Sequence, residues 1–227
     1  MPSRPARSAR RSSLALAGAL SFAPAFFGAA AAAADASAPH PHKGKAKKFS
    51  NPTASTLTAE ESAKLLAGGA VRKQVKYAEA GGRGISIMDV AATPEQIWSV
   101  ILDFGSYPKW IDQLSSCKVL SKSGQHIFVE FELKVLGMGV QYWIDHTYNK
   151  DKGTLTWQLD YSKQSDLDDS TGYWLVYPAP DHPGFTRVEY TVDIRVSGWV
   201  PSSIEDMLAK KGLEQATGWV KKQAEAR

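Results

Sequence analysis

The chain contains only one cysteine among its 227 residues, which excludes an intrachain disulfide and a cysteine-rich zinc or iron–sulfur site. It also lacks the HExxH, GxSxG and CxxC patterns of metalloproteases, nucleophilic hydrolases and redox dithiols. We therefore expect neither a bound metal nor a cofactor. The remaining composition is ordinary, with 43% hydrophobic and 22% charged residues, and it excludes collagen, coiled-coil arrays and wholesale disorder.

Positive charge is scarce beyond the first 50 residues. Residues 1–50 contain eight Lys or Arg and one Asp, a net charge of +7, whereas the whole chain carries only +4. The remainder therefore carries −3. Because nucleic acid binding needs a dense cationic surface that displaces phosphate counterions, we do not expect a nucleic acid partner.

The N-terminus has the pattern of a secretory signal peptide. Four arginines among the first eleven residues precede an uncharged stretch from Ser12 to Ala34, whose apolar centre is interrupted by Pro24. Small residues permit cleavage after Ala34 or Ala36, so we predict a signal peptide over residues 1–36 and an exported, periplasmic or secreted protein. An uncleaved anchor helix is the alternative, and a pair of adjacent arginines leaves the twin-arginine route open.

Residues 37–56 are predicted to form a linker. Three prolines oppose helix formation here, and four lysines between residues 43 and 48 repel one another. His40 and His42 beside these lysines could contact a metal or an anionic membrane surface, but a solvated tether is the favoured interpretation. Transient membrane contact stays open as a property of this segment.

Two helix starts follow from capping patterns. Thr58 with Glu61 three residues later predicts a short helix that ends before Gly68. Thr93, followed by proline and glutamate, predicts a second helix with an apolar face over residues 97–104. Strands are predicted over residues 71–77 and 84–90, and a further short helical turn over 107–114.

From Cys117 to Val196 the apolar period changes from 3.6 to 2 residues. The clearest strand covers residues 186–196, in which apolar and polar side chains alternate. This pattern predicts an antiparallel sheet with one dry and one solvated face. A long final helix is predicted from Pro201 to about Glu225. Gly212 lies on its apolar face, where the missing side chain makes room for a packing partner or for a bound molecule.

The order of these elements resembles the helix-grip fold of the START and polyketide-cyclase superfamily. Residues 93–110 resemble its opening segment, with a leading Pro-Glu, a helical Trp, an Asp-Phe and a Tyr-Pro corner. Residues 172–175 with 184–190 resemble its late hairpin, and residues 198–201 the turn into its closing helix. The bacterial START-like and coenzyme Q-binding START-like branches are the most similar.

The resemblance implies an α+β domain over residues 57–227, in which a curved antiparallel sheet wraps around a long C-terminal helix. It further implies an internal apolar cavity that holds a lipid, sterol, quinone or polycyclic molecule. Relatives also include cyclases and dehydratases, and fold alone does not choose between these roles.

Aromatic residues on the predicted strands are the best candidates for the cavity wall. Tyrosine and tryptophan offer apolar area with one polar tip, which suits an amphiphile better than a charged metabolite, although each can equally be plain core. The predicted ligand-binding residues are Tyr142, Ile144, His146, Trp157, Tyr161, Trp174, Tyr190, Leu208 and Gly212.

The histidines divide by position. His146 shares the parity of the cavity-facing residues, and three roles are open to it: general base, polar anchor or a satisfied core histidine, the last being favoured. His126 and His182 are expected in solvent, and the acidic run over residues 166–169 is expected to be a solvated loop. Cys117 is expected to be a small core residue.

Two principal functions are consistent with this sequence. The favoured one is an exported, monomeric carrier of a hydrophobic small molecule. The alternative is a cyclase or dehydratase acting on a polyketide-like or isoprenoid substrate, with His146 and Tyr190 as catalytic residues and Tyr142 as an orienting donor. A module that docks a partner protein through exposed tryptophans is a third interpretation.

Overall fold

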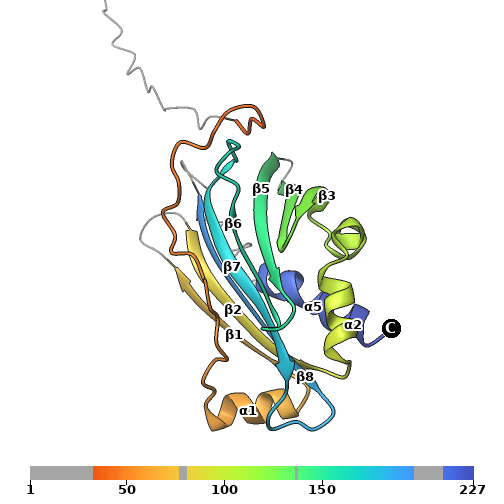
Figure 1. The fold of residues 1–227 in the computed structure, drawn as a ribbon. Coiled ribbons are helices and arrows are strands. Elements are labelled where there is room, and N and C mark those ends of the chain that lie inside the picture. Colours follow the sequence, from red (N-terminus) through yellow and green to blue (C-terminus); the bar gives the residue numbers. More distant parts are fainter. Residues whose placement is uncertain (1–32, 77–80, 136–137, 197–211) are drawn as a thin grey trace, which may run out of the picture. The chain divides into compact units, whose positions relative to one another are not determined.

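Eight antiparallel strands form one curved sheet in the order β1-β2-β8-β7-β6-β5-β4-β3 (Figure 1). The computed structural model describes residues 33–76, 81–135, 138–196 and 212–227. The strands are β1 (Ala70–Lys76), β2 (Gly81–Val90), β3 (Leu114–Ser123), β4 (His126–Val135), β5 (Met138–Asn149), β6 (Thr154–Leu159), β7 (Leu167–Pro178) and β8 (Thr186–Val196). The predicted α+β class with an antiparallel sheet is confirmed.

The helices begin where the capping patterns predict. The Thr58 hydroxyl accepts the backbone amide of Glu61, whose carboxylate accepts the amide of Thr58, and Thr93 makes the same reciprocal pair with Gln96. The helices are α1 (Ala59–Leu66), α2 (Pro94–Ile101), the 3-10 turn η1 (Phe104–Ser106), α3 (Tyr107–Trp110) and α5 (Gly212–Ala224). Among the residues that the structure describes, no helix is both long and apolar enough to cross a membrane.

Helix α5 packs on the inner side of the sheet along β2. A Cβ atom on Gly84 would lie 2.7 Å from Leu213 Cδ2, so the absence of a side chain at Gly84 lets the helix approach. One turn further on, the hydroxyls of Thr217 and Ser86 are 3.1 Å apart. A glycine of the sheet therefore provides the close approach between α5 and β2.

The inner face of the sheet carries the main core. Val188, Tyr190 and Val192 of β8 lie in this core, as their alternation predicts. Ile144 and Trp157 from the neighbouring half of the sheet belong to the same cluster. The predicted dry face is thus correct.

Residues 33–57, here called the strap, run over the outer face of the sheet before α1 begins (Figure 1). The backbone amides of Lys45 and Ala46 donate to Asp169 Oδ2 at 2.5 and 2.6 Å. The Phe49 ring lies 5.1 Å from the ring of Tyr173. The prediction of a solvated tether is therefore wrong for this segment, because carboxylates on the sheet bind its backbone.

The strap buries charged residues that the sequence predicts to lie in solvent. Glu189 and Asp169 are both 0% exposed. The Glu189 carboxylate accepts the Ser55 hydroxyl at 2.6 Å and the Tyr177 hydroxyl at 2.5 Å. Such buried charges are tolerated only when hydrogen bonds replace their hydration. The predicted solvated face of β8 is thus wrong in its central part, where the strap covers it.

Candidate functional site

Aromatic side chains from successive strands line the inner face of the sheet. His146 of β5 pairs with Trp157 of β6, and Trp174 of β7 pairs with Tyr190 of β8. Tyr142, four residues before His146 on β5, shares its face. The prediction that these five residues lie on strands is confirmed.

These five side chains, here called the aromatic wall, form a continuous series of ring contacts together with Phe131 of β4. Tyr142 stacks on Phe131 with centroids 5.2 Å apart and an interplanar angle of 8°. The Trp157 centroid is 6.1 Å from His146 and 5.5 Å from Tyr190. These distances and tilts fall within the favourable range for aromatic pairs, so the wall from β4 to β8 is one apolar surface.

Rings from the helical segments continue this surface. Phe104 of η1 has its centroid 5.0 Å from His146. Trp219 of α5 lies 4.6 Å from Tyr107 and stacks on Trp110 at 5.4 Å. The sequence interpretation omitted these four residues from the candidate site, although their positions in the 93–110 segment and on the last helix's apolar stripe were a usable signal.

Polar atoms within this wall lack hydrogen-bond partners. Across the described part of the chain, His146 Nδ1 and Trp219 Nε1 are buried without a hydrogen bond. Each such group costs about 1–3 kcal/mol if left unsatisfied. Buried unpaired groups of this kind call for a water molecule or a ligand atom. His146 is thus a core histidine, as the sequence favours, but it is satisfied only in part, because its Nδ1 has no hydrogen bond.

The ionisable groups of the wall are held neutral. Burial lowers the pKa of His146 from 6.5 to about 3, against a smaller opposing effect of the Ile127 backbone. Burial likewise raises the pKa values of Tyr142 and Tyr190 above their ordinary value of 10.0. At neutral pH the inner face therefore presents uncharged polar groups in an apolar setting.

The neutral state of His146 predicts a pH-dependent stability. Its folded pKa lies below the unfolded value, so the unfolded chain binds more protons between pH 6.5 and about 3, and stability falls as the pH drops through this window. Between pH 6.5 and 5 the native chain should lose about 1.6 kcal/mol more than His146→Gln. Urea unfolding of both proteins at several pH values measures this difference, and parallel pH profiles would refute it.

The other predicted ligand residues have mixed outcomes. Ile144 is buried on the inner face. Tyr161 follows β6 instead of lying on a strand, and its hydroxyl donates to Asp169 Oδ1 at 2.8 Å. Its predicted strand position is wrong. Leu208 lies outside the described residues, and Gly212 is described only as the first residue of α5.

Two sequence expectations about surface groups are corrected. His182 is partly buried, stacks on Phe185, and its Nδ1 lies 3.0 Å from Asp89 Oδ2. The acidic run over residues 166–169 is not a solvated loop, because part of it lies in β7 and its side chains bind the strap. The acidic run thus holds the strap on the outer face of the sheet, and His182 binds Asp89 near the end of β2.

Two further expectations are confirmed. His126 is exposed and lies 2.7 Å from Asp145. Cys117 is buried in the core, and burial raises the pKa of its thiol to about 12, so it stays a thiol at neutral pH. Neither side chain is one of the polar groups of the aromatic wall.

The proposed catalytic pair is not in direct contact. The strand register places Trp157 beside His146, and Tyr190 in the adjacent row of the sheet. Within the described residues no hydrogen bond joins His146 to Tyr190 or to Tyr142. A base with a pKa near 3 also removes protons poorly at neutral pH. The arrangement suits a polar anchor better than a general base.

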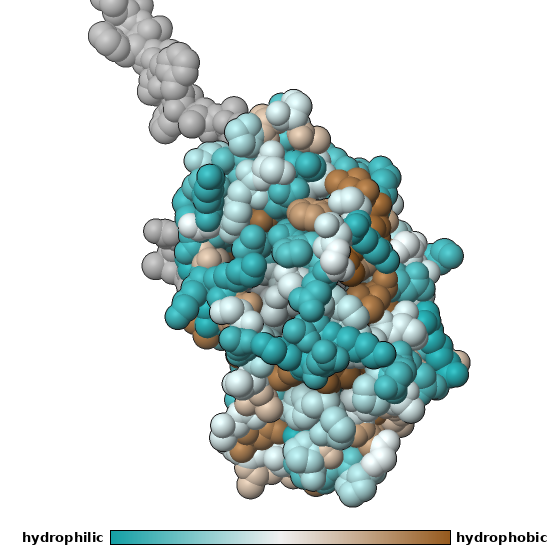
Figure 2. Space-filling view, viewed as in Figure 1, coloured by the Kyte–Doolittle hydropathy of each residue, from teal (hydrophilic) through white to brown (hydrophobic). Residues whose placement is uncertain are grey.

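In Figure 2 hydrophobic residues gather beside β3 and β4, toward the side of α3, and the strap side is mostly hydrophilic. Val119 and Leu120 of β3 are among the exposed apolar side chains at this edge of the sheet.

A curved antiparallel sheet with a helix on its inner face and an aromatic interior defines a helix-grip protein. The chain belongs to the family described as polyketide cyclase / dehydrase and lipid transport, which matches residues 86–225. The description of this family covers cyclases, dehydrases and lipid transport. A comparison with curated proteins finds no match.

Several solved structures share the fold at low sequence identity. The Zhui aromatase/cyclase from Streptomyces sp. R1128 is 14% identical, with a TM-score of 0.54, 69% of this chain covered and 96% of that one. A START superfamily protein from Mycobacterium smegmatis is 20% identical, with a TM-score of 0.50 and coverage of 69% and 97%. Human StAR-related lipid transfer protein 5 is 12% identical, with a TM-score of 0.55 and coverage of 70% and 83%.

Proposed function

We propose that this protein is an exported carrier that holds a hydrophobic molecule with one polar group against the inner face of its sheet. The observation that carries the proposal is the pair of buried, unpartnered atoms His146 Nδ1 and Trp219 Nε1 in an otherwise aromatic wall. A lipid, sterol, quinone or polycyclic isoprenoid has the required chemistry: a large apolar body and a neutral polar group that can pair with one of these atoms.

Apolar burial supplies enough binding energy for this role. A guest that buries about 300 Å² of apolar surface gains about 7 kcal/mol before the costs of ordering are subtracted. Since the wall is uncharged at neutral pH, it offers no partner for a buried ionic group, which would be expensive to desolvate. The site therefore favours neutral amphiphiles over charged metabolites.

Transport accounts for the site better than catalysis does. The low pKa of His146 and its separation from Tyr190 leave a proton-transfer mechanism without an effective base. A carrier needs only shape, apolar area and one or two hydrogen bonds. The same residues that would be weak catalysts are adequate anchors.

The export part of the proposal rests on the N-terminal sequence. The predicted cleavage positions after Ala34 and Ala36 fall at the start of the strap. Removal of the leader there would retain the contacts that His40, Lys45 and Ser55 make with the sheet. The exported form would therefore keep most of its strap.

Competition binding to the full chain tests the proposal. The uncharged fluorescent probe N-phenyl-1-naphthylamine should bind and be displaced by at least one of a fatty alcohol, a sterol and a long-chain quinone. His146→Phe removes the unpartnered Nδ1 but keeps an aromatic ring, and it should weaken a competitor that bonds to this atom by about 2- to 10-fold. Tyr173→Phe, on the outer face, is the matched control and should change affinity less than twofold. Failure of all three competitors would reject a hydrophobic guest, and equal losses in both variants would reject the inner face as its site.

A further inference from the structure

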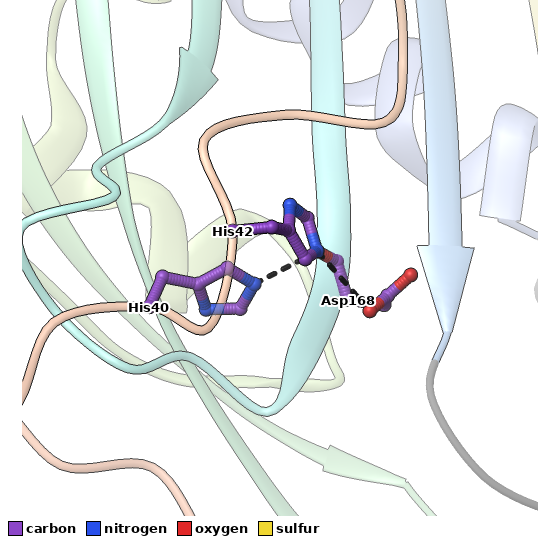
Figure 3. A group of neighbouring side chains, drawn as sticks. All are labelled: His40, His42 and Asp168. Atoms are coloured by element: carbon purple, nitrogen blue, oxygen red, sulfur yellow. Dashed lines mark hydrogen bonds and ion pairs between the residues drawn. The ribbon is translucent and has the colours of Figure 1, made fainter.

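Two histidines of the strap and an aspartate of β7 meet at one point on the outer face (Figure 3). The metal-ligating atoms of His40, His42 and Asp168 all lie within 4.8 Å of one another. His40 is only 8% exposed, and the side chains of His42 and Asp168 are 20% and 18% exposed. A cluster this well shielded, built from segments more than 120 residues apart, exists only when the strap is docked.

We propose that His40, His42 and Asp168 bind one divalent transition-metal ion of the Zn²⁺ class, which fastens the strap to the sheet. Two imidazoles and one carboxylate form a common set of three protein ligands for zinc, with water completing the coordination. Ligand atoms about 2.0–2.1 Å from a tetrahedral ion lie about 3.3 Å from one another. His42 Nε2 and Asp168 Oδ1 are already 3.2 Å apart. His40 Nε2 lies 2.9 Å from the Asp168 carbonyl oxygen and needs the larger adjustment.

Metal binding has a defined consequence for the ring protons. Gly44 donates its backbone amide to His42 Nδ1 at 3.1 Å, and Ser165 donates to His40 Nδ1 at a longer 3.4 Å. In this state each neutral ring carries its proton on Nε2. A metal at both Nε2 atoms moves each proton to Nδ1, so these two amide contacts must lengthen. Gly44, with a φ of 111°, has the backbone freedom of glycine at this bend.

Lys45 competes with the metal for Asp168. Its Nζ donates to both carboxylate oxygens at 3.0 and 2.9 Å, while its exposed stem leaves it free to withdraw into solvent. Replacing this cation by an uncharged side chain should therefore favour the metal. Lys45→Met should tighten metal binding by about two- to fivefold, the scale of one exposed ion pair.

Calorimetric titration of the full chain with Zn²⁺ tests the proposal. The native chain should bind one equivalent, and His42→Ala and Asp168→Asn should each weaken binding at least about tenfold. His126→Ala, at an exposed histidine elsewhere, should bind as the native chain does. At a zinc concentration 100 times the dissociation constant, the midpoint of thermal unfolding should rise by about 5–10 °C in the native chain and much less in the two ligand variants.

A spectroscopic readout separates a built site from loose surface binding. Co²⁺ in the native chain should give the strong visible bands of a four-coordinate ion, and these bands should be absent in His42→Ala. Equal affinities of the native chain and both ligand variants would overturn the proposal. If a ligand variant fails to fold, Lys45→Met decides, since binding no tighter than in the native chain contradicts the site.

Discussion

Replacing Gly172 with alanine should lower the free energy of unfolding by about 3 kcal/mol or more. A Cβ atom at this position in β7 would lie 2.2 Å from Trp157 Cζ2 and 2.3 Å from the backbone oxygen of Thr191. The indole can be displaced, but the backbone of the neighbouring strand cannot move without breaking its ladder. The absence of a side chain at Gly172 therefore makes room for the Trp157 ring in the aromatic wall.

Urea unfolding of Gly172→Ala beside the native chain measures this effect. Gly139→Ala is the control, because Gly139 is also in a strand and a Cβ there would meet no atom within 4 Å. Its free energy of unfolding should change by less than about 0.5 kcal/mol. Equal small changes in both variants would show that the wall adapts to a methyl group and is not packed as described.

Removing Arg187 should cost about 3–5 kcal/mol of stability. Its guanidinium donates to Asp89 through Nε at 2.8 Å and through Nη2 at 3.0 Å, and also to Asp181 at 2.5 Å. Both Arg187 and Asp89 are almost fully buried. Without the guanidinium, the Asp89 carboxylate would be left in a site shielded from water, and among the described residues His182 would be its remaining side-chain partner.

A double-mutant cycle checks this assignment. Arg187→Met should show the full loss, and the pair Arg187→Met with Asp89→Asn should lose less than the sum of the two single changes, because the second change removes the stranded charge. Lys118→Met, at an exposed pair with Glu130, should cost less than about 1 kcal/mol. Strict additivity in the cycle would contradict a direct buried pair.

The inner half of this protein could be predicted from sequence because its signals are local. Thr58 and Thr93 mark helix starts through bonds to residues three positions away. Alternation over residues 186–196 places apolar side chains on one face. Both kinds of signal depend on periodicity or on near neighbours, which a single sequence displays directly.

The outer half could not be predicted, because its contacts join distant segments without any periodic pattern. Asp169 accepts backbone amides of residues more than 120 positions earlier, and a backbone amide leaves no mark in a sequence. Lysines and prolines in the strap are equally typical of a free linker. The roles of Gly84 and Gly172 likewise depend on which side chains cross them, which only the packed structure shows.

Native mass spectrometry of the full chain, purified from the organism that makes it, tests the carrier function most directly. We predict one lipophilic molecule per chain, retained under gentle ionisation and recovered by extraction into organic solvent. A bare polypeptide mass in every preparation, together with no uptake of fatty acid, sterol or quinone afterwards, would contradict the central claim.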